Sequence, residues 1–133
     1  MTEGEVNVKV KQWLLDGGYE YKGVLTGYGK IPMGDTGVTI DHKGERYYPI
    51  ETLWVEAQGS CIGIDRLLNG FMSVIFACRY GDFPKGILAM PQGEYDKLSL
   101  YKEFLTNLAK SATATIGLLN VGDMQVDWLN ATP

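Results

Sequence analysis

The sequence predicts an α/β fold in which a mixed sheet is covered by helices on both faces. Its 133 residues, 45% of them apolar and 21% charged, fit one domain with a proper hydrophobic core. Segments whose apolar residues repeat at helical spacing alternate with short apolar or β-branched runs bounded by glycine or proline. This alternation is typical of a mixed sheet with covering helices. We therefore predict a single domain over 1–133 with the element order α-β-β-β-α-β-α-β-β.

The chain opens with an amphipathic helix, predicted over 3–16. Thr2 and Glu5 have the spacing of a capping box, in which each side chain hydrogen-bonds the backbone N–H of the other residue. The apolar residues that follow at helical spacing are Val6, Val10, Trp13 and Leu14. Gly17 and Gly18 then provide the left-handed stop that ends a helix.

Three strands are predicted after this helix. They are rich in aromatic and β-branched residues, and their ranges are 19–26, 38–40 and 46–58. The connections between them are a glycine-rich loop at 27–37 and a turn at 41–44. Pro49 lies within the last strand, which indicates a bulge or an edge position.

Two covering helices and three further strands are predicted in the second half. Asp65 is a candidate cap for the first helix, whose apolar face consists of Leu67, Leu68, Phe71, Met72, Ile75 and Phe76. Residues 86–90 form an apolar run ended by proline, which predicts an interior strand. The residues that predict the second helix are Leu98, Tyr101, Leu105 and Leu108. Strands at 115–121 and 124–129 flank a turn at 122–123 and form a hairpin.

Composition argues against several classes of function. The formal net charge of −4 and the pI near 4.9 disfavour a protein that coats nucleic acid non-specifically, although a local basic groove is compatible with them. Two cysteines without metal-binding spacing and one histidine leave little material for a zinc site or a catalytic triad. The acidic start lacks the pattern of a signal peptide, and charges interrupt the longest apolar segment, 62–80. We expect a cytoplasmic protein without a membrane span.

The most informative segment is the end of the third predicted strand, LWVEAQ at residues 53–58. Because side chains alternate along a strand, Glu56 and Gln58 share one face while Val55 and Ala57 share the other. A carboxylate and an amide at the end of an apolar strand are costly unless they have a use. The plain alternative is that the strand simply leaves the core here.

This arrangement resembles the PD-(D/E)XK nuclease superfamily, which has the restriction-endonuclease-like fold. The resemblance spans nearly the whole chain. The segments that carry it are the opening helix ending in LLDGGYE, the predicted hairpin leading to WVEAQGS, the long helix before GILAMP and the closing hairpin IGLLNVGDMQVDWL. It implies hydrolysis of DNA phosphodiester bonds with Mg²⁺ or Mn²⁺ as the cofactor. By position it assigns Asp35, Glu56 and Gln58 to catalysis, and it assigns Asp35, Glu56 and the Ala57 carbonyl to the metal.

The chain departs from the family pattern at two positions. Gln58 stands where the family usually has lysine, and a neutral amide supplies no positive charge. Arg66 and Lys85 are candidates to supply that charge, although each also fits an ordinary surface role. Gly34 stands in place of the proline that usually precedes the acid at Asp35.

Strand geometry favours Asp35 over Asp41 as the partner acid of Glu56. If the predicted hairpin turns near residues 43–44, Asp41 lies roughly 30 Å from Glu56 at the rise of a strand and is a turn former. Asp35 lies on the other side of the predicted hairpin. A regular hairpin would leave it on the order of 13 Å along the strand from Glu56, and a bulge would close that gap.

Three functions stay open. The first is a metal-dependent DNA nuclease; the second is a catalytically inactive member of the same fold that binds nucleic acid or protein, favoured by Gln58 and the acidic pI. The third is an unrelated α/β domain in which Glu56 forms a structural ion pair.

Glu3 and Glu5 are further candidate metal ligands, because family members often have an acid on the first helix, but capping also explains them. The resemblance also implies a homodimer.

Overall fold

The computed structural model describes residues 1–16, 28–32, 39–43, 45–47, 53–80 and 83–130 of the chain. Its main sheet contains five strands in the order β3-β4-β5-β6-β7. Their bounds are β3 Glu45–Tyr47, β4 Leu53–Ala57, β5 Lys85–Met90, β6 Thr115–Asn120 and β7 Gln125–Trp128. The central strands β4, β5 and β6 are parallel, whereas β3 and β7 run antiparallel at the two edges. The mixed sheet predicted from the sequence is confirmed.

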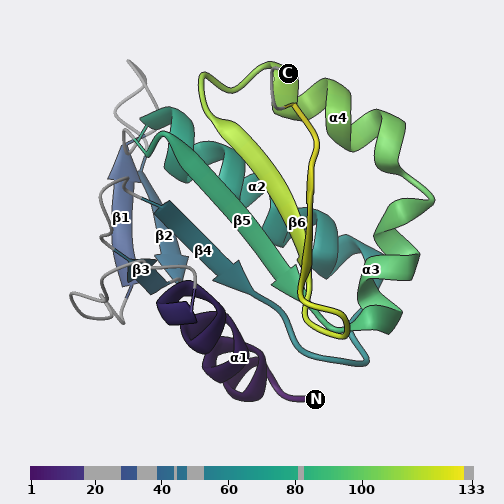
Figure 1. Ribbon diagram of the computed structural model, residues 1–133. Coiled ribbons are helices and arrows are strands. Elements are labelled where there is room, and N and C mark those ends of the chain that lie inside the picture. The colour runs from purple at the N-terminus through teal and green to yellow at the C-terminus, as the bar shows by residue number, and fades with distance from the viewer. Residues whose placement is uncertain (17–27, 33–38, 44, 48–52, 81–82, 131–133) are drawn as a thin grey trace.

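Helices cover both faces of this sheet, as Figure 1 shows. The first, α1 Glu3–Asp16, packs Val6 and Val10 against one face, where they meet Val55 and Ile87. On the other face lies α2 Ile64–Tyr80, whose Leu67, Phe71 and Val74 belong to the larger apolar cluster. Two shorter helices, α3 Gln92–Ser99 and α4 Lys102–Lys110, extend that cluster through Leu98 and Leu105. The prediction of helices on both faces is therefore confirmed.

The capping box at the start of α1 is formed as predicted. The Glu5 N–H donates to Thr2 Oγ1 at 3.2 Å, and the Thr2 N–H donates to Glu5 Oε1 at 3.3 Å. The predicted bounds of this helix, 3–16, agree with the structure. The second predicted helix, the strand near 86–90 and the closing β6–β7 hairpin are also confirmed. Asp65 is not the cap of that helix, because α2 begins at Ile64 and Asp65 lies in its first turn.

The predictions for residues 27–58 are correct only in part, because residues 39–40, 46–47 and 53–57 lie in strands as predicted. A separate two-stranded sheet forms from β1 Tyr28–Pro32 and β2 Thr39–Lys43, in place of the predicted loop and turn at 28–32 and 41–43. Its register pairs Gly29 with His42 and Lys30 with Asp41, so cross-strand pairing overrides the turn preferences of these residues. The strand predicted at 19–26 lies outside the described residues.

The single strand predicted at 46–58 is two antiparallel strands, β3 and β4, with Arg46 opposite Trp54. Proline has no N–H to donate to a ladder, which gives a physical reason for the first strand to end before Pro49.

The second covering helix is interrupted. A continuous helix would place Tyr101 on the same face as Leu98 and Leu105. Instead α3 ends at Ser99 and α4 begins at Lys102, and Tyr101 is 45% exposed while both leucines are fully buried. The periodicity was correct for the buried positions but did not show the break between them.

Candidate functional site

The two faces of β4 carry different side chains, as the alternation predicted. Val55 and Ala57 belong to the apolar cluster beneath α1, and Trp54 belongs to the cluster beneath α2. Glu56 shares the α2 side and is only 7% exposed. The carboxylate is therefore buried at the carboxyl end of a central strand.

A pocket of about 650 Å³ opens at this end of β4. Its walls come from three elements: the start of α1 with Glu3, the end of β4 with Glu56 and Gln58, and the first turns of α2 with Arg66. Residues 59–62, which connect β4 to α2, complete the lining. Two carboxylates, two amides and a guanidinium thus line one cavity, although Glu3 and Arg66 come from segments far apart in the sequence.

The side chain of Gln58 lies over Gly70 of α2. A Cβ added at Gly70 would be 2.8 Å from Gln58 Nε2 and 3.2 Å from Leu88 Cδ1, so the missing side chain is what makes room for the amide. The backbone N–H of Gln58 donates to the Ala89 carbonyl at 2.9 Å, which continues the β4–β5 pairing by one residue. Gln58 is therefore positioned by the sheet and by a glycine in the facing helix.

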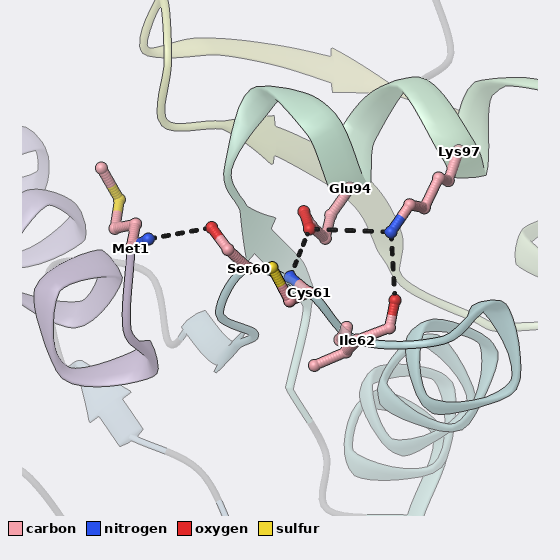
Figure 2. A network of polar contacts seen from close by, with 6 residues as sticks. All are labelled: Met1, Ser60, Cys61, Ile62, Glu94 and Lys97. Atoms are coloured by element: carbon pink, nitrogen blue, oxygen red, sulfur yellow. Dashed lines mark hydrogen bonds and ion pairs between the residues drawn. The ribbon is translucent and has the colours of Figure 1, made fainter.

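The segment before α1 is attached to the connection after β4. The Ser60 N–H donates to the Met1 carbonyl at 2.7 Å. The Met1 amino group donates to Ser60 Oγ at 3.0 Å (Figure 2). The backbone at Gly59 is so close that an added Cβ would be 2.8 Å from the Glu3 nitrogen. These contacts hold the start of α1, and with it Glu3, against the pocket.

The same connection is attached to α3 on its other side. The Cys61 N–H donates to Glu94 Oε1 at 2.9 Å, and Lys97 Nζ donates to the Ile62 carbonyl at 3.2 Å (Figure 2). Glu94 is only 4% exposed, and Lys97 Nζ lies 3.9 Å from its Oε1. Cys61 adopts a φ of 63°, a conformation that is uncommon outside glycine, and these hydrogen bonds hold its backbone in place. Residues 59–62 are thus fixed from two directions.

The residues predicted for the site are brought together in part. Glu56 and Gln58 line the pocket, and Ala57 lies between them with its side chain packed toward α1, so it could offer only its backbone carbonyl. Asp35 lies outside the described residues. Glu3 lines the pocket, whereas Glu5 is engaged in the capping box.

The two candidate cations have different positions. Arg66 lines the pocket. Lys85 lies at the opposite end of the parallel pair, because it is in register with Leu53 while Leu88 is in register with Glu56. Its Nζ lies 5.9 Å from the centre of the Trp128 ring. Lys85 as a substitute for the family lysine is therefore contradicted, because the ammonium group comes from the wrong end of the strand.

The geometry used to place Asp41 far from Glu56 was also wrong. That distance assumed a hairpin turning near residues 43–44, but Asp41 lies inside strand β2. The chain then continues to Glu45, which pairs with Val55, directly before Glu56. Since β3 runs antiparallel to β4, the chain preceding Glu45 approaches the carboxyl end of β4, and four residues span at most about 13 Å. The separation of roughly 30 Å therefore does not follow from the fold, and the fold does not exclude Asp41 as the partner acid of Glu56.

A polar stripe along α2 was not predicted from the sequence. Arg66, Asn69, Gly70 and Ser73 all line the pocket and recur at steps of three, one and three residues. This is the spacing of one helix face, and it interrupts an otherwise apolar pattern. The same periodicity that identified the buried face of α2 could have identified this second face.

The donor set in the pocket is compatible with a magnesium ion. Mg²⁺ takes oxygen ligands, retains several waters and needs only one or two carboxylates, which Glu3 and Glu56 can offer. In the part of the chain that the structure describes, no group of three or more His, Cys, Asp or Glu residues could hold a metal by itself.

No protein-family model, curated protein or solved structure matches the chain. None of the helices among the described residues is long and apolar enough to cross a membrane.

Proposed function

We propose that this protein is a nuclease-like enzyme of the restriction-endonuclease-like fold that hydrolyses DNA phosphodiester bonds with Mg²⁺ or Mn²⁺. One observation carries the proposal: Glu56 and Gln58, on one face of the end of β4, share a pocket with a carboxylate from α1 and an arginine from α2. A cavity that combines oxygen ligands with a cation is suited to a metal ion and a phosphate group together.

Each residue has a role in this proposal. Glu56 is the principal metal ligand, with Glu3 and the Ala57 carbonyl as further oxygen donors and Asp35 or Asp41 as the second strand acid. The metal, when bound, would stabilise charge on the phosphate and lower the pKa of a bound water. Gln58 would donate a hydrogen bond to that water or to a phosphate oxygen.

A second candidate function is a binding module of the same fold without catalysis. The specific observation that favours it is Gln58, because a neutral amide does not supply the positive charge that lysine supplies. The two candidates share a pocket and differ in whether a DNA bond is cleaved; the binding module would take a nucleic acid or a protein as its partner.

The decisive substitution is Glu56→Gln, which preserves shape and removes the negative charge. We expect the wild type to bind Mn²⁺ in calorimetry and to nick supercoiled DNA, and the variant to lose both, with at least about a hundredfold lower cleavage. Glu103→Gln is the matched control, because Glu103 is exposed in the first turn of α4 and does not line the pocket.

The outcomes separate the candidates. If the wild-type protein binds Mn²⁺ and DNA but does not cleave DNA, the result supports the binding module. A Glu56→Gln variant that binds Mn²⁺ like the wild type would refute the metal site. Asp35→Asn and Asp41→Asn, measured in the same way, identify the second carboxylate, because only the residue that ligates the metal should weaken Mn²⁺ binding.

A further inference from the structure

The pocket has a second feature that metal ligation does not use. Along α2, Arg66, Asn69 and Ser73 line the cavity on one helix face, with Gly70 between them leaving space above Gln58. Residues of this kind contact phosphate groups, because guanidinium, amide and hydroxyl groups all donate hydrogen bonds to phosphate oxygens.

Arg66 is available to an anionic ligand. It is exposed, and no ion pair or side-chain hydrogen bond engages its guanidinium within the described part of the chain. It is also the one basic side chain among the described residues that line the pocket. The carboxylates Glu3 and Glu56 approach from α1 and β4, so positive and negative groups come from different walls.

The length of the stripe favours a polynucleotide over a single phosphate. From Arg66 to Ser73 the helix rises by about 10 Å. Successive phosphates of one DNA strand advance by about 3.4 Å along the helix axis, so the stripe is long enough to contact more than one of them. The Ser73 hydroxyl has one proton and donates it to the Asn69 carbonyl at 3.0 Å; to contact a phosphate oxygen, it would exchange that hydrogen bond for one to the phosphate.

We propose that this face of α2 is the phosphate-contacting wall of the pocket and that Arg66 binds the backbone of a nucleic-acid strand. The inference rests on the proposed function for the identity of the ligand, and it names the surface and the residue that recognise it. Arg66 thereby brings from α2 the positive charge that Gln58 cannot provide from β4. Because the chain has a net charge of −4 and nucleic acid is a polyanion, we expect the binding of the strand to depend on a divalent cation.

The test measures binding, not cleavage. A short fluorescein-labelled oligonucleotide is titrated by anisotropy in Ca²⁺, across a range of salt concentrations, with wild-type protein and with Arg66→Ala. We expect the variant to bind roughly tenfold more weakly and to lose about one unit of salt slope. Arg66→Lys should preserve most of the salt slope, since it retains the charge. Inorganic phosphate should compete only weakly, because it reaches one part of the stripe.

Arg79→Ala is the matched control, because Arg79 lies in the last turn of the same helix and does not line the pocket. It should leave the affinity and the salt slope unchanged. Thermal melting of each variant checks that the fold is retained.

The failure of this inference is distinguishable from the failure of the proposed function. If Glu56→Gln abolishes metal binding and cleavage while Arg66→Ala binds the oligonucleotide with wild-type affinity and slope, the inference is wrong and the proposed function stands. If the protein never cleaves DNA but its binding depends on Arg66, the inference stands without catalysis. If the wild type binds no oligonucleotide in Ca²⁺, or if inorganic phosphate competes as strongly as the oligonucleotide, the inference is overturned.

Discussion

The contact between Gln58 and Gly70 makes a sharp prediction about the variant Gly70→Ala. The new Cβ would be 2.8 Å from Gln58 Nε2 and 3.2 Å from Leu88 Cδ1, both closer than ordinary van der Waals contact. Alanine improves the intrinsic stability of a helix interior by about 1 kcal/mol relative to glycine. Since the amide at the end of Gln58 can move away at little cost, we expect its displacement and the slight crowding of Leu88 to offset that gain.

The net change in the free energy of unfolding should therefore lie within about 1 kcal/mol, or roughly 3–5 °C in Tm. Activity should respond more strongly, because the displaced amide loses one hydrogen bond to the ligand or water, which lowers the cleavage rate roughly tenfold. Gly93→Ala is the matched control: it is also helical, and its added Cβ meets nothing within 4 Å. It should raise Tm slightly and leave cleavage unchanged.

A double-mutant cycle isolates the mechanism. In the Gln58→Ala background, Gly70→Ala should cause no further loss of cleavage, because the displaced group is already absent. A Gly70→Ala variant with wild-type cleavage, or one with the same loss in the presence and absence of Gln58, would refute the reasoning.

Two further predictions concern stability. Gly86→Ala should destabilise the protein by about 2 kcal/mol or more in chemical denaturation, because its Cβ would be 2.5 Å from Cys78 Sγ and 2.6 Å from Val74 Cγ1 inside a packed core; a wild-type midpoint would contradict the close approach of α2 to β5. Burial raises the pKa of the Cys78 thiol to about 12 from its usual 9.0, so folding favours the neutral thiol. The contribution of this thiol to the free energy of unfolding is therefore complete below pH 9. From pH 9 upward the contribution should fall by at most about 1.4 kcal/mol per pH unit. Chemical denaturation of the wild type and of Cys78→Ala across that pH range checks this, because the variant should lack this part of the slope.

Much of the fold could be predicted because local signals and tertiary contacts agree. The capping box of Thr2 and Glu5 begins α1 as expected. On the predicted apolar face of α2, Leu67, Phe71 and Ile75 are buried as the periodicity indicated, while Leu68, Met72 and Phe76 are partly buried. The faces of β4 were also predictable, because alternation along a strand follows from backbone geometry alone. In each case the relevant information lies within a few neighbouring residues.

The errors arose where distant pairing decides the structure. Residues 28–32 and 41–43 have turn-forming composition but pair with each other as β1 and β2. The estimate of the distance between Asp41 and Glu56 depended on which strands form a hairpin, and one misplaced turn removed its basis. Turn propensities are weak compared with a ladder of cross-strand hydrogen bonds.

By itself, the sequence determined the class of the fold, the helix over 3–16, the buried faces of the central elements and the shared face of Glu56 and Gln58. These are consequences of periodicity, which a single chain displays directly. Only the tertiary structure decided that Glu3 and Arg66 share a pocket with that pair, that Lys85 does not, and that Gly70 makes room for the amide. Such convergence depends on how α1 and α2 pack across β4, and packing between elements distant in sequence leaves no local pattern to detect.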